Sequence, residues 1–292
     1  MSFPPNVYLI GAQKSGVSSL AKLMSQHPDV CLSNPRATNY FNKNWEKGLQ
    51  WYRQCFREPY KSMCIDASSS YTLAPLDNII DGEVLEGNYA NIPRKIYELV
   101  PNAKFIYILR EPVARAYSAY WHSVRADEES RSFKQVLEEA MILPKNSYYL
   151  RGSEYYDQLL LYLKYFKLDS FKIVFFEDFI SNPVAVTQEC FRFLGQSDKI
   201  QLQDVATSKK SRTLGPLGKL SDKLLFGVSG VKNFTNLVKP LLPEALKKMA
   251  INLLSQKIPD ISDEDKLLLS EHYQDSIVKL EELLGHSITQ WK

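Results

Sequence analysis

Four runs of consecutive apolar residues punctuate the chain, and none of them alternates with polar positions. They occupy residues 7–10, 63–65, 105–109 and 173–176. Strands of a parallel sheet are covered by helices on both faces, so they read as continuous apolar runs rather than as alternating ones. The pattern therefore predicts four buried strands of a mainly parallel sheet.

Helical periodicity fills the intervals between these runs. Apolar residues recur every three or four positions at residues 17–26, 92–99, 113–124, 155–166 and 184–194. Asn182 and Pro183 mark the start of the last of these helices, and Gly195 marks its end. Ser262, followed by three acidic residues, marks the start of one more helix. Alternating strands and helices predict a three-layer α/β fold, with helices on both faces of a central sheet.

The composition adds no strong charge bias to this picture. Of the 292 residues, 45% are hydrophobic, and 36 Lys and Arg stand against 33 Asp and Glu, for a net charge of +3. This balance disfavours binding to nucleic acid or to a membrane surface, so any anion site must be local. No apolar run approaches the ~20 residues of a membrane span. The chain opens on Pro4 and Pro5 before a core strand, so we expect an unprocessed cytoplasmic protein.

The cysteines indicate neither a metal site nor a disulfide framework. The four of them are scattered without C-x-x-C spacing, at Cys31, Cys55, Cys64 and Cys190. Zinc sites and small disulfide-rich scaffolds both show closely spaced cysteines. We expect ordinary buried thiols and no bound metal.

A loop rich in Gly, Lys and Ser joins the first predicted strand to the first predicted helix. Gly11 and Gly16 allow the backbone to turn tightly and approach an anion, the helix start offers unpaired N–H groups, and Lys14 adds a full charge. The nucleotide-triphosphatase loop is G-x-x-x-x-G-K-[ST], whereas Val17 follows the second glycine here and the lysine precedes it. We interpret the loop as a phosphate cradle in a P-loop-like fold; a tight turn without a ligand is the alternative.

A second candidate anion site follows the strand predicted at residues 105–109. Arg110 lies at the carboxyl end of that strand, where ligands collect in open α/β sheets. On the next helix Ser118 and His122 are four residues apart and share a face. A guanidinium fork and a hydroxyl suit an oxyanion, so Arg110 and Ser118 are candidates for a phosphate site. The alternative is an ion pair between Arg110 and its neighbouring glutamate at a helix start.

Together the two motifs resemble those of sulfotransferases. Residues 11–20 are similar to the 5′-phosphosulfate loop of that family, G-x-x-K-x-G-T-[TS]-x-L, and residues 109–118 are similar to its 3′-phosphate motif, L-R-[DE]-P-x-x-R-x-x-S. Weaker similarity extends through the segment at 66–71 to the tail at 283–291. The bacterial and heparan-type branch is the most similar.

The resemblance implies a donor and the residues that bind it. Members of the family bind 3′-phosphoadenosine 5′-phosphosulfate (PAPS) and transfer its sulfuryl group to a hydroxyl or amine by in-line displacement, without a metal, leaving 3′-phosphoadenosine 5′-phosphate (PAP). By similarity, Arg110 and Ser118 hold the 3′-phosphate. By the same similarity, the 5′-phosphosulfate is bound by the loop residues Gly11, Lys14, Ser15, Gly16, Val17, Ser18 and Ser19. Lys210, Ser211 and Arg212 resemble a late K-G-R element that closes over the donor, although the glycine is missing.

Two departures from the family pattern concern the chemistry. Val17 replaces the usual threonine of the loop, and Ala37 stands where relatives carry a glutamate that removes the acceptor proton. Asp66, at the end of a predicted strand, is our first candidate for the base, and His122 is the second. Each candidate has a structural alternative: Asp66 caps the turn at Ser68, and His122 is a surface histidine. An acceptor that is already nucleophilic needs no base at all.

Three further expectations complete the sequence-based interpretation. Residues 1–292 are expected to form one domain, with 208–243 as a lid or acceptor-side insertion or, alternatively, a solvated helical excursion. The modest net charge favours a small-molecule or glycan acceptor. Two other functions stay open: a P-loop kinase or NTPase that binds magnesium through Glu177 and Asp178, and a PAPS-binding protein without turnover, for which Ala37 is the motive.

Overall fold

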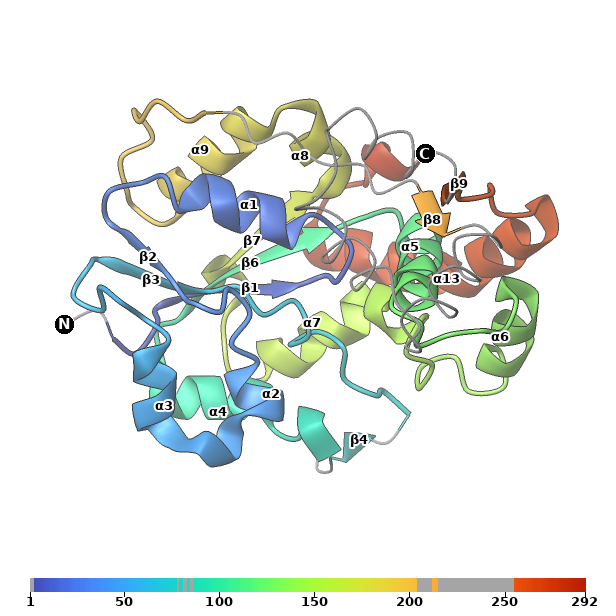
Figure 1. The fold of residues 1–292 in the computed structure, drawn as a ribbon, viewed down its shortest axis with the longest axis horizontal. Coiled ribbons are helices and arrows are strands. Elements are labelled where there is room, and N and C mark those ends of the chain that lie inside the picture. The colour runs from blue at the N-terminus through green and yellow to red at the C-terminus, as the bar shows by residue number, and fades with distance from the viewer. Residues whose placement is uncertain (1–2, 78, 81–82, 85–86, 204–211, 215–254) are drawn as a thin grey trace, which may run out of the picture.

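A parallel sheet forms the centre of the molecule (Figure 1). The computed structural model describes residues 3–292 apart from 78, 81–82, 85–86, 204–211 and 215–254, and within these residues the sheet has five strands in the order β2-β3-β1-β6-β7. Every neighbouring pair is parallel. The strands are β1 (Val7–Gly11), β2 (Val30–Leu32), β3 (Met63–Asp66), β6 (Lys104–Leu109) and β7 (Phe171–Phe175).

Helices cover both faces and one end of this sheet (Figure 1). One face is covered by α1 (Val17–Met24), α8 (Phe176–Ser181) and α9 (Pro183–Phe193). The other face is covered by α2 (Tyr40–Lys43), α3 (Gly48–Gln54), α4 (Ile92–Leu99) and α7 (Tyr155–Leu163). At the end lie α5 (Pro112–Arg125), α6 (Phe133–Ala140) and α13 (Asp263–Leu284). The arrangement confirms the predicted three-layer α/β fold.

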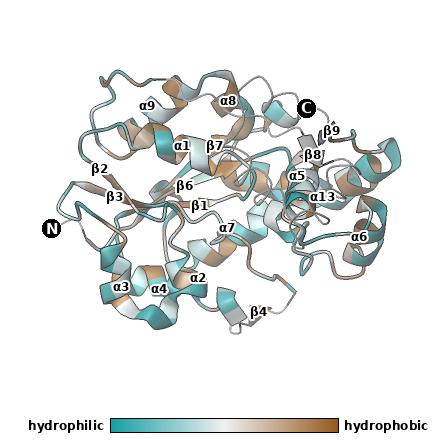
Figure 2. Cartoon of the chain, in the orientation of Figure 1, coloured by the Kyte–Doolittle hydropathy of each residue, from teal (hydrophilic) through white to brown (hydrophobic). Residues whose placement is uncertain are grey.

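Two apolar cores sandwich the sheet because successive side chains of a strand point to opposite faces. In β1, Val7 and Leu9 pack into the core under α1, α8 and α9, whereas Tyr8 and Ile10 pack into the core over α3, α4 and α7. All five residues of β1 are buried. Figure 2 shows the same pattern, with hydrophobic residues along the central strands and polar residues on the outer helix faces.

The predicted strand and helix starts hold to within a few residues. The Asn182 side chain accepts a hydrogen bond from the Ala185 N–H (3.1 Å), and the Ser262 side chain accepts one from the Asp265 N–H (3.1 Å), so both cap their helices. Strand β7 ends at Phe175 rather than at the predicted residue 176, because α8 begins there without a loop. The predicted helix at 155–166 ends earlier, at Leu163.

Two short antiparallel strand pairs lie outside the central sheet. One joins β4 (Ile79–Ile80) to β5 (Glu83–Val84), and the other pairs β8 (Arg212–Leu214) with β9 (Ser255–Lys257). Strand β8 is the described part of the predicted insertion at 208–243; the remainder lies outside the described residues. That 1–292 is one domain stays a prediction.

The cysteines behave as expected from their spacing. All four are free and buried, at Cys31, Cys55, Cys64 and Cys190. Within the described ranges, no helix combines the length and the apolar character needed to cross a membrane.

Gly11 allows β1 to approach the Thr72 side chain closely. A methyl group at this position would overlap the Thr72 hydroxyl, which donates a hydrogen bond to the Ile10 carbonyl (3.1 Å). We predict that Gly11→Ala lowers the free energy of unfolding by about 1–3 kcal/mol, as overpacking does elsewhere. Thr72→Ala should relieve part of this cost, so urea denaturation of both single variants and the double variant should give a coupling of at least about 0.5 kcal/mol.

Gly48 provides the matched control for this cycle. A methyl group at Gly48 meets no atom within 4 Å, so Gly48→Ala and Thr72→Ala should act independently. Additive effects of Gly11→Ala and Thr72→Ala would show that the close approach at β1 is not what requires glycine.

Candidate functional site

The loop between β1 and α1 has the backbone geometry of a tight anion cradle. Lys14 and Gly16 both have positive φ, at 75° and 90°. A side chain on Gly16 would also come within 3.2 Å of the Phe176 ring, so glycine is required there by conformation and by space. Gly16 is the N-cap of α1 and brings no side chain to it, so no side-chain cap competes with an anion for the N–H donors at the helix start, although the Ser19 N–H already donates to the Gly16 carbonyl (2.9 Å).

Two side chains of this loop are buried, with different consequences. The Ser15 hydroxyl is fully buried and has no hydrogen-bond partner among the described residues. A buried polar group without a partner is costly, so this orphan hydroxyl fits a ligand that supplies an acceptor. Val17 packs into the core with Leu9 and Ile65, so it offers the cradle only its backbone N–H. Ser18 is exposed and Ser19 is partly buried.

Arg110 lies directly against this loop. Its Nη1 donates a hydrogen bond to the Lys14 carbonyl (3.2 Å), and its guanidinium carbon lies 4.9 Å from the centre of the Phe176 ring. Burial lowers the pKa of Arg110 from its ordinary value, an effect that the nearby Tyr155 opposes. In the part of the chain that the structure describes, Arg110 forms no ion pair. A partly buried cation with a fork of donors and no carboxylate partner fits a phosphate.

The other residues of the second motif divide between the helix and the core. The Glu111 carboxylate caps α5 by accepting the N–H groups of Val113 (3.0 Å) and Ala114 (2.7 Å), so the glutamate serves the helix start. Arg115 is fully buried and donates to the Ser153 hydroxyl and to a backbone carbonyl. Ser118 is partly buried on α5. Arg115 therefore bonds within the core, and Arg110 and Ser118 stay the candidates of this motif for an anion.

Asp66 ends β3 beside β1 and sits in a cage of hydroxyl groups. One carboxylate oxygen accepts from Ser68 (2.6 Å); the other accepts from Thr38 (2.6 Å), Tyr52 (2.8 Å) and Tyr71 (2.9 Å). The side chain is fully buried, which raises the pKa of Asp66, and the four hydrogen bonds oppose that rise. Any proton that reaches this carboxylate has to pass through one of the hydroxyls.

The segment carrying Ala37 is tied to the turn that follows Asp66. Arg36 Nη1 donates to the Ala67 carbonyl (2.6 Å), and the Asn39 N–H donates to the Ser68 hydroxyl (3.0 Å). Ala37 itself is partly buried between these two anchors. The turn after Asp66 thus fixes the backbone on both sides of Ala37.

The remaining predicted site residues lie farther along the chain. His122 is exposed in the last turn of α5, one turn beyond Ser118. Arg212 begins β8, a strand that contacts α5. Lys210 and Ser211 lie outside the described residues.

Tyr148 borders the phosphate loop and Arg151 lies beside Tyr148, and sequence reasoning missed both. Gln13 Nε2 donates to the Tyr148 hydroxyl (2.8 Å), although 135 residues separate them. The Arg151 guanidinium lies over the rings of Tyr89 (5.2 Å) and Tyr148 (6.0 Å). No spacing rule connects these residues, since only the fold brings them together.

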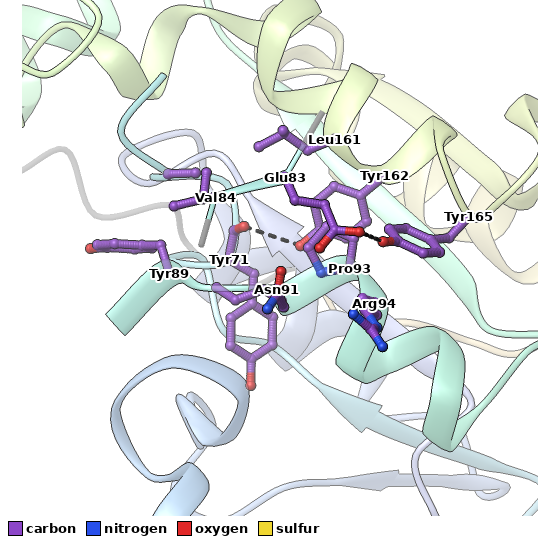
Figure 3. Close-up of a pocket in the computed structure, with 12 residues that line it drawn as sticks. Tyr71, Glu83, Val84, Tyr89, Asn91, Pro93, Arg94, Leu161, Tyr162 and Tyr165 are labelled. Carbon is purple, nitrogen blue, oxygen red and sulfur yellow. Dashed lines mark hydrogen bonds between the residues drawn. The ribbon is translucent and has the colours of Figure 1, made fainter. Parts of the chain in front are cut away.

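A pocket opens between the β4–β5 hairpin, α4 and α7 (Figure 3). Tyrosines dominate its lining, together with Glu83, Asn91 and Arg94. Tyr162 donates to the Tyr71 carbonyl (3.1 Å), and Glu83 accepts from Tyr165. Since the Tyr71 hydroxyl binds Asp66, the pocket and the Asp66 cage share one residue.

Known proteins with similar sequences are sulfotransferases. Heparan sulfate glucosamine 3-O-sulfotransferase 5 of Mus musculus is 27% identical over 204 residues, which cover 67% of this chain and 55% of that protein. Bifunctional heparan sulfate N-deacetylase/N-sulfotransferase 3 of Mus musculus is 25% identical over 305 residues, covering 98% of this chain and 31% of that protein. The chain thus spans about half the length of the first of these relatives, and less of the second.

A solved structure has the same fold. The crystal structure of a sulfotransferase from Alicyclobacillus acidocaldarius superimposes with a TM-score of 0.68 at 22% identity, covering 98% of both chains. The family model for the sulfotransferase domain matches residues 4–213, which include β1, the phosphate loop, Arg110 and the Asp66 cage. The resemblance predicted from the two anion motifs is confirmed, and the chain belongs to the sulfotransferase domain family.

Proposed function

We propose that this protein transfers the sulfuryl group of PAPS to a hydroxyl or amine of a small-molecule or glycan acceptor. The observation that carries the proposal is the hydrogen bond from Arg110 to the Lys14 carbonyl (3.2 Å), which joins two anion motifs into one site. PAPS carries phosphate at both ends of its adenosine and so needs two such motifs. Family membership supports the same donor.

The chain offers a separate group of residues to each end of the donor. Lys14, the orphan Ser15 hydroxyl and the loop amides of residues 15–19 bind the 5′-phosphosulfate in this proposal. Two of these amides, those of Ser15 and Ser19, also donate to the Ala12 and Gly16 carbonyls within the loop. Arg110 and Ser118 bind the 3′-phosphate, and Arg212 belongs to a strand that contacts α5. Bound here, PAPS supplies an activated sulfuryl group.

Lys14 contributes most to the chemical step. The acceptor oxygen or nitrogen forms a bond to sulfur while the bond from sulfur to the bridging oxygen breaks, and the electron pair leaves on that oxygen. An ammonium group beside the oxygen stabilises the transition state more than the ground state, because the charge is still developing.

The acceptor proton has two candidate bases. Asp66 would receive the proton through one of its four hydroxyl partners, whereas His122 would remove it directly from the acceptor at the exposed face of α5.

A PAPS-binding protein without turnover is the second candidate function, motivated by Ala37. A magnesium-dependent kinase is disfavoured, because Glu177 and Asp178 already accept hydrogen bonds from Glu111, Trp291 and Gln290.

Thermal denaturation with nucleotides tests the identity of the donor. We expect PAP at saturating concentration to raise Tm, because a ligand that binds only the folded state stabilises it. ATP, and ATP with Mg²⁺, should raise Tm less, since neither presents a 3′-phosphate to Arg110. Stabilisation by ATP with Mg²⁺ alone would overturn the proposal.

Substitutions at the two anion motifs should separate chemistry from donor binding. We predict that Lys14→Ala lowers kcat by roughly a hundredfold or more with a smaller change in PAP affinity. Arg110→Ala should weaken PAP binding roughly 10- to 100-fold, as expected for a lost charge-assisted hydrogen bond of about 1.5–3 kcal/mol, with a smaller change in kcat. Transfer of labelled sulfate and calorimetric titration with PAP measure the two effects.

Arg110→Lys is the control for charge without the guanidinium fork. It should recover only part of the PAP affinity, because an ammonium cannot make the bidentate contact. Equal losses of kcat and of affinity in Lys14→Ala and Arg110→Ala would contradict the roles assigned here.

The identity of the base is tested by the pH dependence of kcat/KM. Loss of the base should slow transfer by roughly 10²–10⁴-fold and remove the acid limb of the profile. If the base is Asp66, that limb should lie above the ordinary range of an aspartate, because burial raises its pKa, and Asp66→Asn should abolish it. If the base is His122, His122→Ala should do so. Unchanged profiles in both variants would eliminate both residues.

A further inference from the structure

The short turn η5 (Thr289–Trp291) packs against the carboxyl end of β7, where the donor site begins. The Trp291 ring lies 5.6 Å from the ring of Phe175 and 5.8 Å from that of Tyr155, measured between centroids. Its indole N–H donates a hydrogen bond to Glu177 Oε2 (3.2 Å). One side chain thus contacts both β7 and the first residues of α7 and α8.

Glu177 also hydrogen-bonds to the peptide next to Arg110. Its other carboxylate oxygen, Oε1, accepts the N–H of Glu111 (3.0 Å). Glu111 directly follows Arg110 and begins α5, so the Glu177 carboxylate fixes the peptide that joins Arg110 to its helix. A carboxylate that accepts an N–H at each oxygen holds both donors in a defined geometry.

Tyr155 also holds the backbone of Arg110. Its hydroxyl donates to the Arg110 carbonyl (2.7 Å) and accepts from the Arg110 N–H (3.3 Å). Tyr155 is fully buried and has the Trp291 ring against it. Both groups that fix the backbone of Arg110 are therefore in contact with Trp291.

We propose that Trp291 is a positioning residue for Arg110. By orienting Glu177 and Tyr155, it holds the backbone from which the guanidinium reaches the phosphate loop and the 3′-phosphate of the donor. The inference rests on the proposed function, since only a bound donor makes the position of Arg110 matter. It adds to the site a residue that lies 181 positions beyond Arg110 in the chain.

Calorimetric titration of the full chain with PAP tests this role directly. Trp291→Ala should weaken PAP binding at least tenfold, and Trp291→Phe, which keeps a ring but loses the N–H, should weaken it several-fold. KM for PAPS should rise in the same order while kcat at saturating PAPS changes less than twofold, because Lys14 is untouched. Gln290→Ala is the matched control: it removes a hydrogen bond to Asp178 (2.9 Å) in the same turn and should leave affinity within twofold.

A double-mutant cycle separates this role from a general effect on folding. Trp291→Phe and Glu177→Ala both remove the hydrogen bond between Trp291 and Glu177, so the double variant should bind PAP no more weakly than the weaker single variant. These two variants also keep the test decisive if Trp291→Ala does not fold. Three results would each overturn the inference. They are losses of PAP affinity that multiply in the double variant, wild-type PAP affinity in Trp291→Ala, and a loss of PAP affinity in Gln290→Ala equal to that in Trp291→Ala. Absence of PAP binding by the wild-type protein would instead overturn the proposed function, and this inference with it.

Discussion

The hydrogen bond from Arg110 to the Lys14 carbonyl is the contact on which the site depends. It joins the ends of β1 and β6, two adjacent strands whose motifs are almost a hundred residues apart in the chain. A buried guanidinium is tolerated only where its donors are satisfied. The contact with the loop carbonyl and the Phe176 ring meets part of that need, and the proposed function assigns the rest to a phosphate. The geometry of the cradle and the charge beside it are therefore one feature.

The parts of the molecule that could be predicted from sequence are those specified by local chemistry. Buried parallel strands reveal themselves as apolar runs, and positive φ at Gly16 follows from the strand–loop–helix pattern. Strand β2 was missed because three residues carry no periodicity. Helix α6 was also missed, although Ser132 and Gln135 form a capping box, which is a signal of a helix start that the sequence contains. Tyr148 and Trp291 had none, because their partners Gln13 and Glu177 lie more than a hundred residues away.

Asp66 illustrates how a residue type and its surroundings carry different information. An aspartate at the end of a parallel strand suggests a group that faces a ligand. The structure surrounds it with hydroxyls, keeps the Arg36 guanidinium within electrostatic reach, and ties the segment around Ala37 to the neighbouring turn. Burial of this kind depends on residues from α3 and from two loops, which no window of sequence combines. The role of this carboxylate is therefore determined by its surroundings in the folded chain and not by its residue type.

The position of Val17 has a consequence for the whole protein. Because its side chain is packed with Leu9 and Ile65, the first turn of the anion cradle is anchored in the same core that stabilises the fold. Under the proposed function, this packing holds the start of α1 in place before a nucleotide binds, so that little conformational entropy is lost on binding. Substitutions deep beneath α1, far from any ligand, would loosen these amides and reduce affinity while the chain remains folded. Under the proposed function, selection for tight nucleotide binding therefore also constrains the apolar core beneath α1.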